Sequence, residues 1–184
     1  MIYYFSGTGN SRTVAHCLGK LLECDVADMS ATQQIPDLGF TKSLGLVFPV
    51  YAWGLPNVVE QFVSRLNLLA DDVYVWAVMT CGDDMGYADT ILDKCLYRAS
   101  GRHVQSVYSV PMPNTYVCLP GFDVDAPEVA SAKVEHTRNF LPAIARGIRL
   151  QAKECNVERG AFPWLKTYVL RPLFNRFLLT DRYF

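Results

Sequence analysis

A run of small polar residues follows the first hydrophobic stretch of the chain and has the composition of a phosphate-binding loop. This first loop consists of Ser6, Gly7, Thr8, Gly9, Asn10 and Ser11. Glycines let a ligand approach the backbone closely, and the free amides at the start of a following helix attract an anion. The hydroxyl and amide side chains add neutral donors. The loop can therefore hold a phosphate monoester without a cationic side chain.

Other phosphate motifs fit this stretch badly. A dinucleotide fingerprint, G-x-G-x-x-G, would need glycine where Arg12 stands, and the nucleoside-triphosphate motif G-x-x-x-x-G-K-[ST] does not occur in the sequence. The remaining alternative is an ordinary strand-to-helix turn that is capped by Asn10 or Ser11. The first loop alone leaves both interpretations open.

Two further segments place aromatic residues beside glycines after hydrophobic runs. The second loop, residues 49–56, contains Pro49, Tyr51, Ala52, Trp53 and Gly54. The third loop, residues 80–87, contains Thr80, Cys81, Gly82, Asp83, Gly86 and Tyr87. A single aromatic residue usually serves packing. Two aromatic loops that converge on a phosphate loop favour a flat, conjugated ligand with a phosphate group.

Several other kinds of site are disfavoured. Cys81 has neither a basic phosphate cradle nor a nearby histidine in the sequence, so a phosphatase nucleophile is a poor interpretation. The six cysteines form no C-x-x-C motif, and the three histidines have no metal or triad spacing. A net charge of -1 gives no electrostatic drive toward nucleic acid. We expect reduced thiols in a cytoplasmic protein.

The elements that must position these loops alternate along the chain, which favours an α/β fold with helices on both faces of a parallel sheet. The predicted strands are 2–5, 24–27, 44–50, 73–80 and 103–110. The predicted helices are 11–22, 56–66, 86–99 and 127–148, the last with a kink at Pro142. Because loops at the carboxyl ends of parallel strands share one edge, we expect the three loops to meet there.

On these residues the chain resembles the flavodoxin family over residues 1–150. The first loop resembles the family's phosphate loop, Trp53-Gly54 its first flavin loop, and Cys81-Gly82-Asp83 with Tyr87 its second. The stretches IYYFSGTGNS, FPVYAWGLP and VPMPNTYV look like the flavodoxin part of bacterial proteins in which a ferredoxin module follows on the same chain. The resemblance implies a doubly wound, five-stranded parallel sheet in the order 2-1-3-4-5, with a C-terminal helical extension. It also implies flavin mononucleotide (FMN) as the cofactor.

The resemblance suggests roles for individual residues. Trp53 would cover one face of the flavin ring and Tyr87 the other, and Gly54 would be a hinge whose carbonyl reorients toward flavin N5. Asp83 and Asp84 would add negative charge near the ring, although an acidic pair on a loop is as readily explained as solvated.

We expect a one-electron carrier that exchanges electrons with a ferredoxin module or another redox protein. The alternative is an FMN-dependent reductase that passes hydride from NAD(P)H to a quinone or similar acceptor, and the sequence leaves open whether the chain is an enzyme. A third hypothesis, a docking module that has lost its cofactor, conflicts with the intact first loop.

Two segments remain to be placed. The loop 111–126 either closes over the flavin through Asn114 and Tyr116 or is a surface loop without ligand contact. Residues 151–184 are predicted to be an amphipathic connector to a ferredoxin. Contact of this basic segment with a membrane surface is the less favoured interpretation, because Pro172 interrupts it.

Overall fold

The computed structural model describes residues 1–32, 42–66, 72–115 and 124–177. Within these ranges, six parallel strands form one sheet in the order β2-β1-β3-β4-β5-β6. The strands are β1 (Ile2–Tyr4), β2 (Val26–Asp28), β3 (Ser43–Pro49), β4 (Tyr74–Cys81), β5 (Ser106–Pro111) and β6 (Cys155–Asn156). The helices are α1 (Asn10–Leu22), α2 (Asn57–Val63), α3 (Ala88–Ser100), α4 (Pro127–Arg149), α5 (Pro163–Leu165), the π-helix η1 (Lys166–Leu170) and α6 (Arg171–Phe177).

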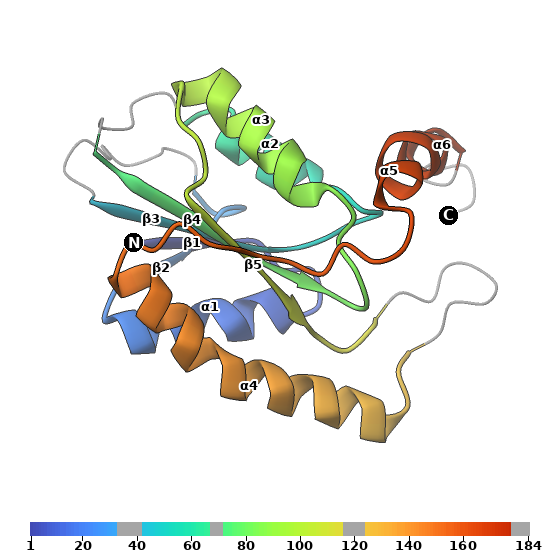
Figure 1. The fold of residues 1–184 in the computed structure, drawn as a ribbon, viewed down its shortest axis with the longest axis horizontal. Helices are drawn as coiled ribbons and strands as arrows, with labels where there is room; N and C mark the ends of the chain where they lie inside the picture. Colours follow the sequence, from blue (N-terminus) through green and yellow to red (C-terminus); the bar gives the residue numbers. More distant parts are fainter. Residues whose placement is uncertain (33–41, 67–71, 116–123, 178–184) are drawn as a thin grey trace.

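The sheet is covered on both faces. Helices α1 and α4 lie on one face and α2 and α3 on the other (Figure 1). Every residue of β4 is buried, as the continuous hydrophobic run of a central parallel strand requires. One core cluster includes Phe48 and Phe62, and the other, under α1 and α4, includes Trp76 and Leu141. The two layers together hold the strand ends in a fixed register.

The predicted α/β architecture and strand order 2-1-3-4-5 are confirmed, and the boundaries of the predicted elements shift by a few residues at most. The predicted number of five strands is wrong, because β6 pairs with β5 at the edge of the sheet. Both residues of β6 are exposed, so no hydrophobic pattern marks it. Its place is set by polar contacts: Val107 N donates to Glu154 O at 2.8 Å, and Glu158 N to Ser109 Oγ at 2.7 Å.

After β6, which is parallel to β5, the chain continues at the carboxyl-terminal end of the sheet. There α5 and α6 lie beside the second and third loops (Figure 1). We call residues 154–171 the C-terminal strap. Among the described residues, no helix combines the length and hydropathy that a bilayer crossing would need.

The strand order also reverses direction next to β1. The chain runs from β1 outward to β2, then returns to the other side of β1 to form β3. In open parallel sheets, ligands bind at such a switch point, outside the carboxyl ends of the strands. The first loop follows β1 and the second loop follows β3, so the two loops meet at this point.

Candidate functional site

The first loop has the geometry of an open anion nest. Gly9 precedes α1 with a left-handed φ of 100°, and its amide donates to Ser6 Oγ at 3.0 Å. The first hydrogen bond of the helix runs from Thr13 N to Gly9 O at 2.9 Å, so the amides of residues 10–12 have no partner within the helix. A Cβ atom on Gly9 would meet no atom within 4 Å. The space beside Gly9, immediately before α1, is therefore open.

The side chains expected to cap α1 have other partners. The helix has no side-chain cap, and Asn10 Nδ2 donates instead to the carbonyl of Pro113 at 3.0 Å. Ser11, 1% exposed, shares a hydrogen bond of 2.8 Å with Thr80 Oγ1 beneath the loop. Thr8 stays exposed, and its hydroxyl accepts a hydrogen bond from Thr115 at 3.4 Å. Of these side chains, Thr8 is the hydroxyl that remains accessible to a ligand.

The second loop contains a tight two-residue turn. Tyr51 and Gly54 exchange two backbone hydrogen bonds of 3.0 Å, and the central residues Ala52 and Trp53 have φ values of 44° and 56°. A turn with positive φ at both central positions normally carries asparagine and glycine, because other residues are strained there. The turn directs the side chains of Tyr51 and Trp53 toward different parts of the structure.

Tyr51 reaches the first loop. A Cβ atom on Gly7 would clash with the Tyr51 hydroxyl, so the phenol lies directly against the first loop. The ring also packs edge-on against Phe5, with centroids 6.3 Å apart, and the side chain is 45% exposed. Partial burial raises the pKa of the phenol above its usual value of 10.0, which keeps the group neutral at physiological pH.

The third loop is bordered by the chain that leaves β5. A Cβ atom on Gly82 would lie 3.0 Å from Asn114 Cγ, and Asn114 N donates to Asp125 Oδ2 at 2.9 Å. Lys133 bridges Asp125, at 2.7 Å, and Asp83, at 3.4 Å. Part of the loop 111–126 therefore lies at the site edge. Tyr116, the other residue expected to close the site, lies outside the described residues.

Cys81 is not a competent nucleophile in this structure. The thiol is buried, and burial, followed by the charges of Asp84 and Asp83, raises its pKa to about 12. A thiol with such a pKa carries almost no thiolate at neutral pH. The raised pKa argues against Cys81 as a phosphatase nucleophile, the interpretation that the sequence already makes a poor one.

Trp53 and Tyr87 both face the C-terminal strap. Lys166 Nζ lies 5.8 Å from the centre of the Trp53 ring, and the ring of Tyr87 lies 6.0 Å from that of Tyr168. A Cβ atom on Gly86 would lie 2.9 Å from Trp53 Cβ, so the second and third loops are in direct contact. The strap residues at this contact were not predicted as site residues, since no motif in their amphipathic segment distinguishes them.

The predicted site residues thus fall into two groups. One group is the first loop with Tyr51 and Gly82, which lies together with Asn114 at the edge of the site that we call the open edge. The other group, Trp53, Gly86 and Tyr87, contacts the strap. Within the second loop Pro49 and Ala52 are half-buried, and within the third loop Thr80 and Cys81 are buried. Gly54 is buried under Arg171, whose guanidinium occupies the space that a Cβ atom would need.

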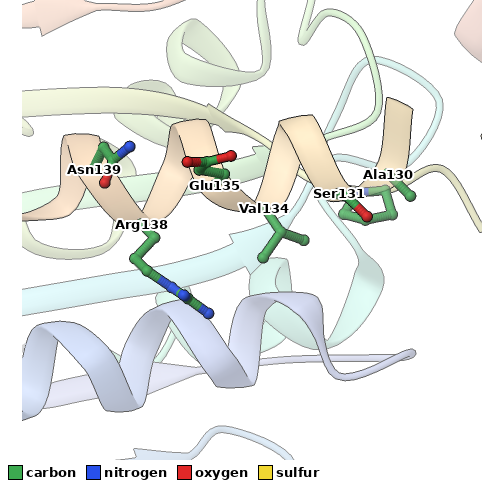
Figure 2. A pocket seen from close by; sticks show the side chains of 7 residues that line it. Ala130, Ser131, Val134, Glu135, Arg138 and Asn139 are labelled. Carbon is green, nitrogen blue, oxygen red and sulfur yellow. The ribbon is translucent and has the colours of Figure 1, made fainter. Parts of the chain in front are cut away.

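A groove of about 470 Å³ lies between Pro113 and α4. Figure 2 shows Val134 and Arg138 extending from α4 toward α1, with Glu135 and Asn139 on the same helix. The lining contains no aromatic ring, and its one arginine is accompanied by a carboxylate. The groove therefore lacks the features of the open edge at Tyr51.

These observations define the class: the chain has a flavodoxin-like fold. A short-chain flavodoxin associated with a non-canonical PDU bacterial microcompartment shares it with a TM-score of 0.51 at 15% identity, over 82% of this chain and 96% of that one. A flavodoxin from Fusobacterium nucleatum, solved with bound flavin mononucleotide, shares it with a TM-score of 0.51 at 9% identity, over 83% of this chain and 97% of that one. By sequence, the chain matches no family model and no curated protein.

Proposed function

We propose that the chain binds FMN and carries single electrons between proteins. The observation that supports this most strongly is the open nest at Gly9, which lies beside an exposed aromatic ring, Tyr51, at the switch point of a flavodoxin-like sheet. A phosphate bound to the nest would accept hydrogen bonds from the amides at the start of α1 and from Thr8. The residues present therefore fit the phosphate end of the cofactor.

For the ring, Tyr51 is the better placed of the two aromatic residues of the second loop. It is exposed and touches the phosphate loop, whereas Trp53 packs under Lys166. We infer that Tyr51 stacks on the flavin and that Gly82 and Asn114 border its edge. When bound, FMN supplies one-electron redox chemistry, and the chain supplies orientation and electrostatics.

The acidic pair of the third loop contributes unequally to the charge at this edge. Asp84 forms an ion pair of 2.5 Å with Lys166 and is largely buried, so its charge is locally balanced. Asp83 is 77% exposed and lies 3.4 Å from Lys133. We infer that Asp83, rather than Asp84, contributes negative charge at the solvent side of the site.

Titration of the apoprotein with FMN and riboflavin tests the cofactor. Quenching of flavin fluorescence should show that FMN binds more than about tenfold tighter than riboflavin, because only FMN engages the nest. Equal affinities would place the phosphate elsewhere, and the absence of binding at micromolar concentration would refute the proposal and favour a docking module.

Anaerobic reduction separates a carrier from a reductase. A carrier should take up two electrons in two separated steps in a potentiometric titration and react slowly with NADH and NADPH. Rapid bleaching by either nucleotide would instead support the reductase of a quinone or similar acceptor. For the partner we propose a ferredoxin or another small redox protein, supported by the sequence resemblance and testable by the rate of electron exchange with a purified ferredoxin.

A further inference from the structure

We propose that the C-terminal strap, residues 154–171, is a working part of the cofactor site, in which Thr167 positions the second and third loops relative to each other. This inference rests on the proposed binding of FMN. It differs from the role of a connector that the sequence suggested, because it gives the segment a task within this domain.

Thr167 joins the two loops through one hydroxyl group. Its Oγ1 accepts a hydrogen bond from Tyr87 N at 2.9 Å and donates to Trp53 O at 3.4 Å. The residue is 2% exposed, so water does not compete for either bond. The backbones of the second and third loops are therefore held at the distance that this hydroxyl sets.

The turn in the second loop needs such support. Ala52 and Trp53 both adopt left-handed backbone conformations, and neither is a glycine or an asparagine. Conformations of this kind persist only where surrounding contacts impose them. The strap supplies these contacts, through Thr167 on the Trp53 carbonyl, Lys166 over the Trp53 ring and Arg171, whose Nη2 lies 3.4 Å from Leu55 O.

Glycines in both loops leave room for the strap. A Cβ atom on Gly86 would lie 2.5 Å from Thr167 Oγ1, and one on Gly54 would clash with the guanidinium of Arg171. Gly54 is not among the glycines with positive φ, so the close approach of Arg171, rather than its own conformation, requires a glycine there. In each loop, the absence of a Cβ atom on one glycine thus leaves space for one side chain of the strap.

Ion pairs fix the strap along its length. Lys166 pairs with Asp84 in the third loop at 2.5 Å, and Arg171 pairs with Glu60 in α2 at 2.9 Å. Arg159 pairs with Asp89 at the start of α3. At the beginning of the strap, Glu154 accepts a hydrogen bond from the Tyr108 hydroxyl at 2.9 Å. Because the strap is attached at both ends, Thr167 is held firmly enough to position other groups.

The strap lies on the side of Trp53 and Tyr87, while Tyr51 and the first loop face the open edge. Loss of the Thr167 hydroxyl should loosen the loops that border the ring and leave the phosphate nest intact. The affinities for FMN and riboflavin should then fall by the same factor, since both ligands carry the ring.

The test uses the full chain with Thr167→Val, which keeps the shape and removes the hydroxyl, and Thr167→Ser, which keeps the hydroxyl. Thr32→Val makes the same change after β2, at the edge of the sheet opposite to β5 and β6, where the Thr32 hydroxyl donates to Asp28 O. Hydrogen exchange of the Tyr87 amide should be at least about fivefold faster in Thr167→Val, because its acceptor is gone. FMN and riboflavin should each bind about fivefold to tenfold more weakly, and Thr167→Ser should restore both properties.

Two results separate the failure of this inference from that of the proposed function. If the wild-type protein binds FMN and Thr167→Val binds it equally well, or loses affinity for FMN but not for riboflavin, the positioning role is overturned and the function stands. If the wild-type protein binds neither flavin, the proposed function fails and this inference fails with it.

Discussion

Ser11 Oγ and Thr80 Oγ1 lie 2.8 Å apart in the buried space between the start of α1 and the end of β4. The bond joins residues that are 69 positions apart in the sequence. It ties the first loop to the centre of the sheet from below, and it leaves Thr8 to face solvent above. Ser11 and Thr8, two of the three hydroxyl residues of the loop, are therefore in different surroundings, Ser11 buried in the fold and Thr8 exposed to solvent.

We predict that Ser11→Ala lowers the free energy of unfolding by about 1–3 kcal/mol, because it leaves the buried Thr80 hydroxyl without its partner. The double variant Ser11→Ala with Thr80→Val should lose less than the sum of the single variants. Urea denaturation of the four proteins measures this coupling. Additive losses would show that the bond does not contribute to stability.

Thr8→Val should weaken FMN binding by about fivefold or more and leave riboflavin binding nearly unchanged, because in the proposed complex the hydroxyl would donate to the phosphate. Parallel fluorescence titrations give both affinities. Thr32→Val, after β2 and outside the three loops, is the matched control. A loss that is the same for the two flavins would show that Thr8 acts on the shape of the loop.

Tyr51→Ala should weaken binding of both flavins by about tenfold, the effect expected when one aromatic stacking partner is lost. Tyr51→Phe should bind both nearly as well as the wild type, since the ring remains. The measurement also decides between the two aromatic residues of the second loop. If Trp53→Phe lost more flavin affinity than Tyr51→Ala, Trp53 rather than Tyr51 would be the residue that stacks on the flavin ring.

The Asp125 carboxylate makes stability depend on pH at the acid end. The bond with Lys133, followed by the one from Asn114 N, holds its pKa below the ordinary value of 3.8. Its stabilising effect is therefore complete above the pKa of the unfolded chain and is lost as pH falls through the lower pKa of the folded state. Asp125→Asn should be less stable than the wild type at pH 7, and the difference should shrink below about pH 4, measured by denaturation at both pH values. A difference that is constant with pH would exclude the charge as its cause.

Cys81 should resist alkylation in the folded protein, because burial raises its pKa to about 12. Iodoacetamide at pH 8 should modify the exposed Cys17 and Cys155 long before Cys81, as peptide mass spectrometry can show. Denaturant should remove the protection. Rapid labelling of native Cys81 would mean that the third loop opens far more often than its contacts suggest.

The sequence predicted the main strands and helices because each carries a continuous or periodic hydrophobic pattern, as β4 and α1 do. β6 has two exposed residues and no such pattern. The first loop was recognisable from its glycines and hydroxyls. The direction of the Ser11 side chain was not, because it depends on Thr80, which only the folded sheet brings near.

The second loop shows a further limit of sequence patterns. A tyrosine and a tryptophan two positions apart look equivalent in sequence, and their different surroundings follow from the positive φ values of Ala52 and Trp53. The sequence suggests a hinge at Gly54 and gives no sign that Arg171, more than a hundred positions later, fills the space above it. Such long-range partners leave no local signal.

The strap also affects when the site is completed during synthesis. Its contacts join residues far apart in the chain: Thr167 lies 114 positions after Trp53, and Arg171 lies 111 positions after Glu60. A ribosome makes chain at about 5–20 residues per second, so the second loop leaves it several seconds before its partner exists. During that interval the strained turn has no support from Thr167. We expect the second and third loops to be brought together only after the strap has emerged.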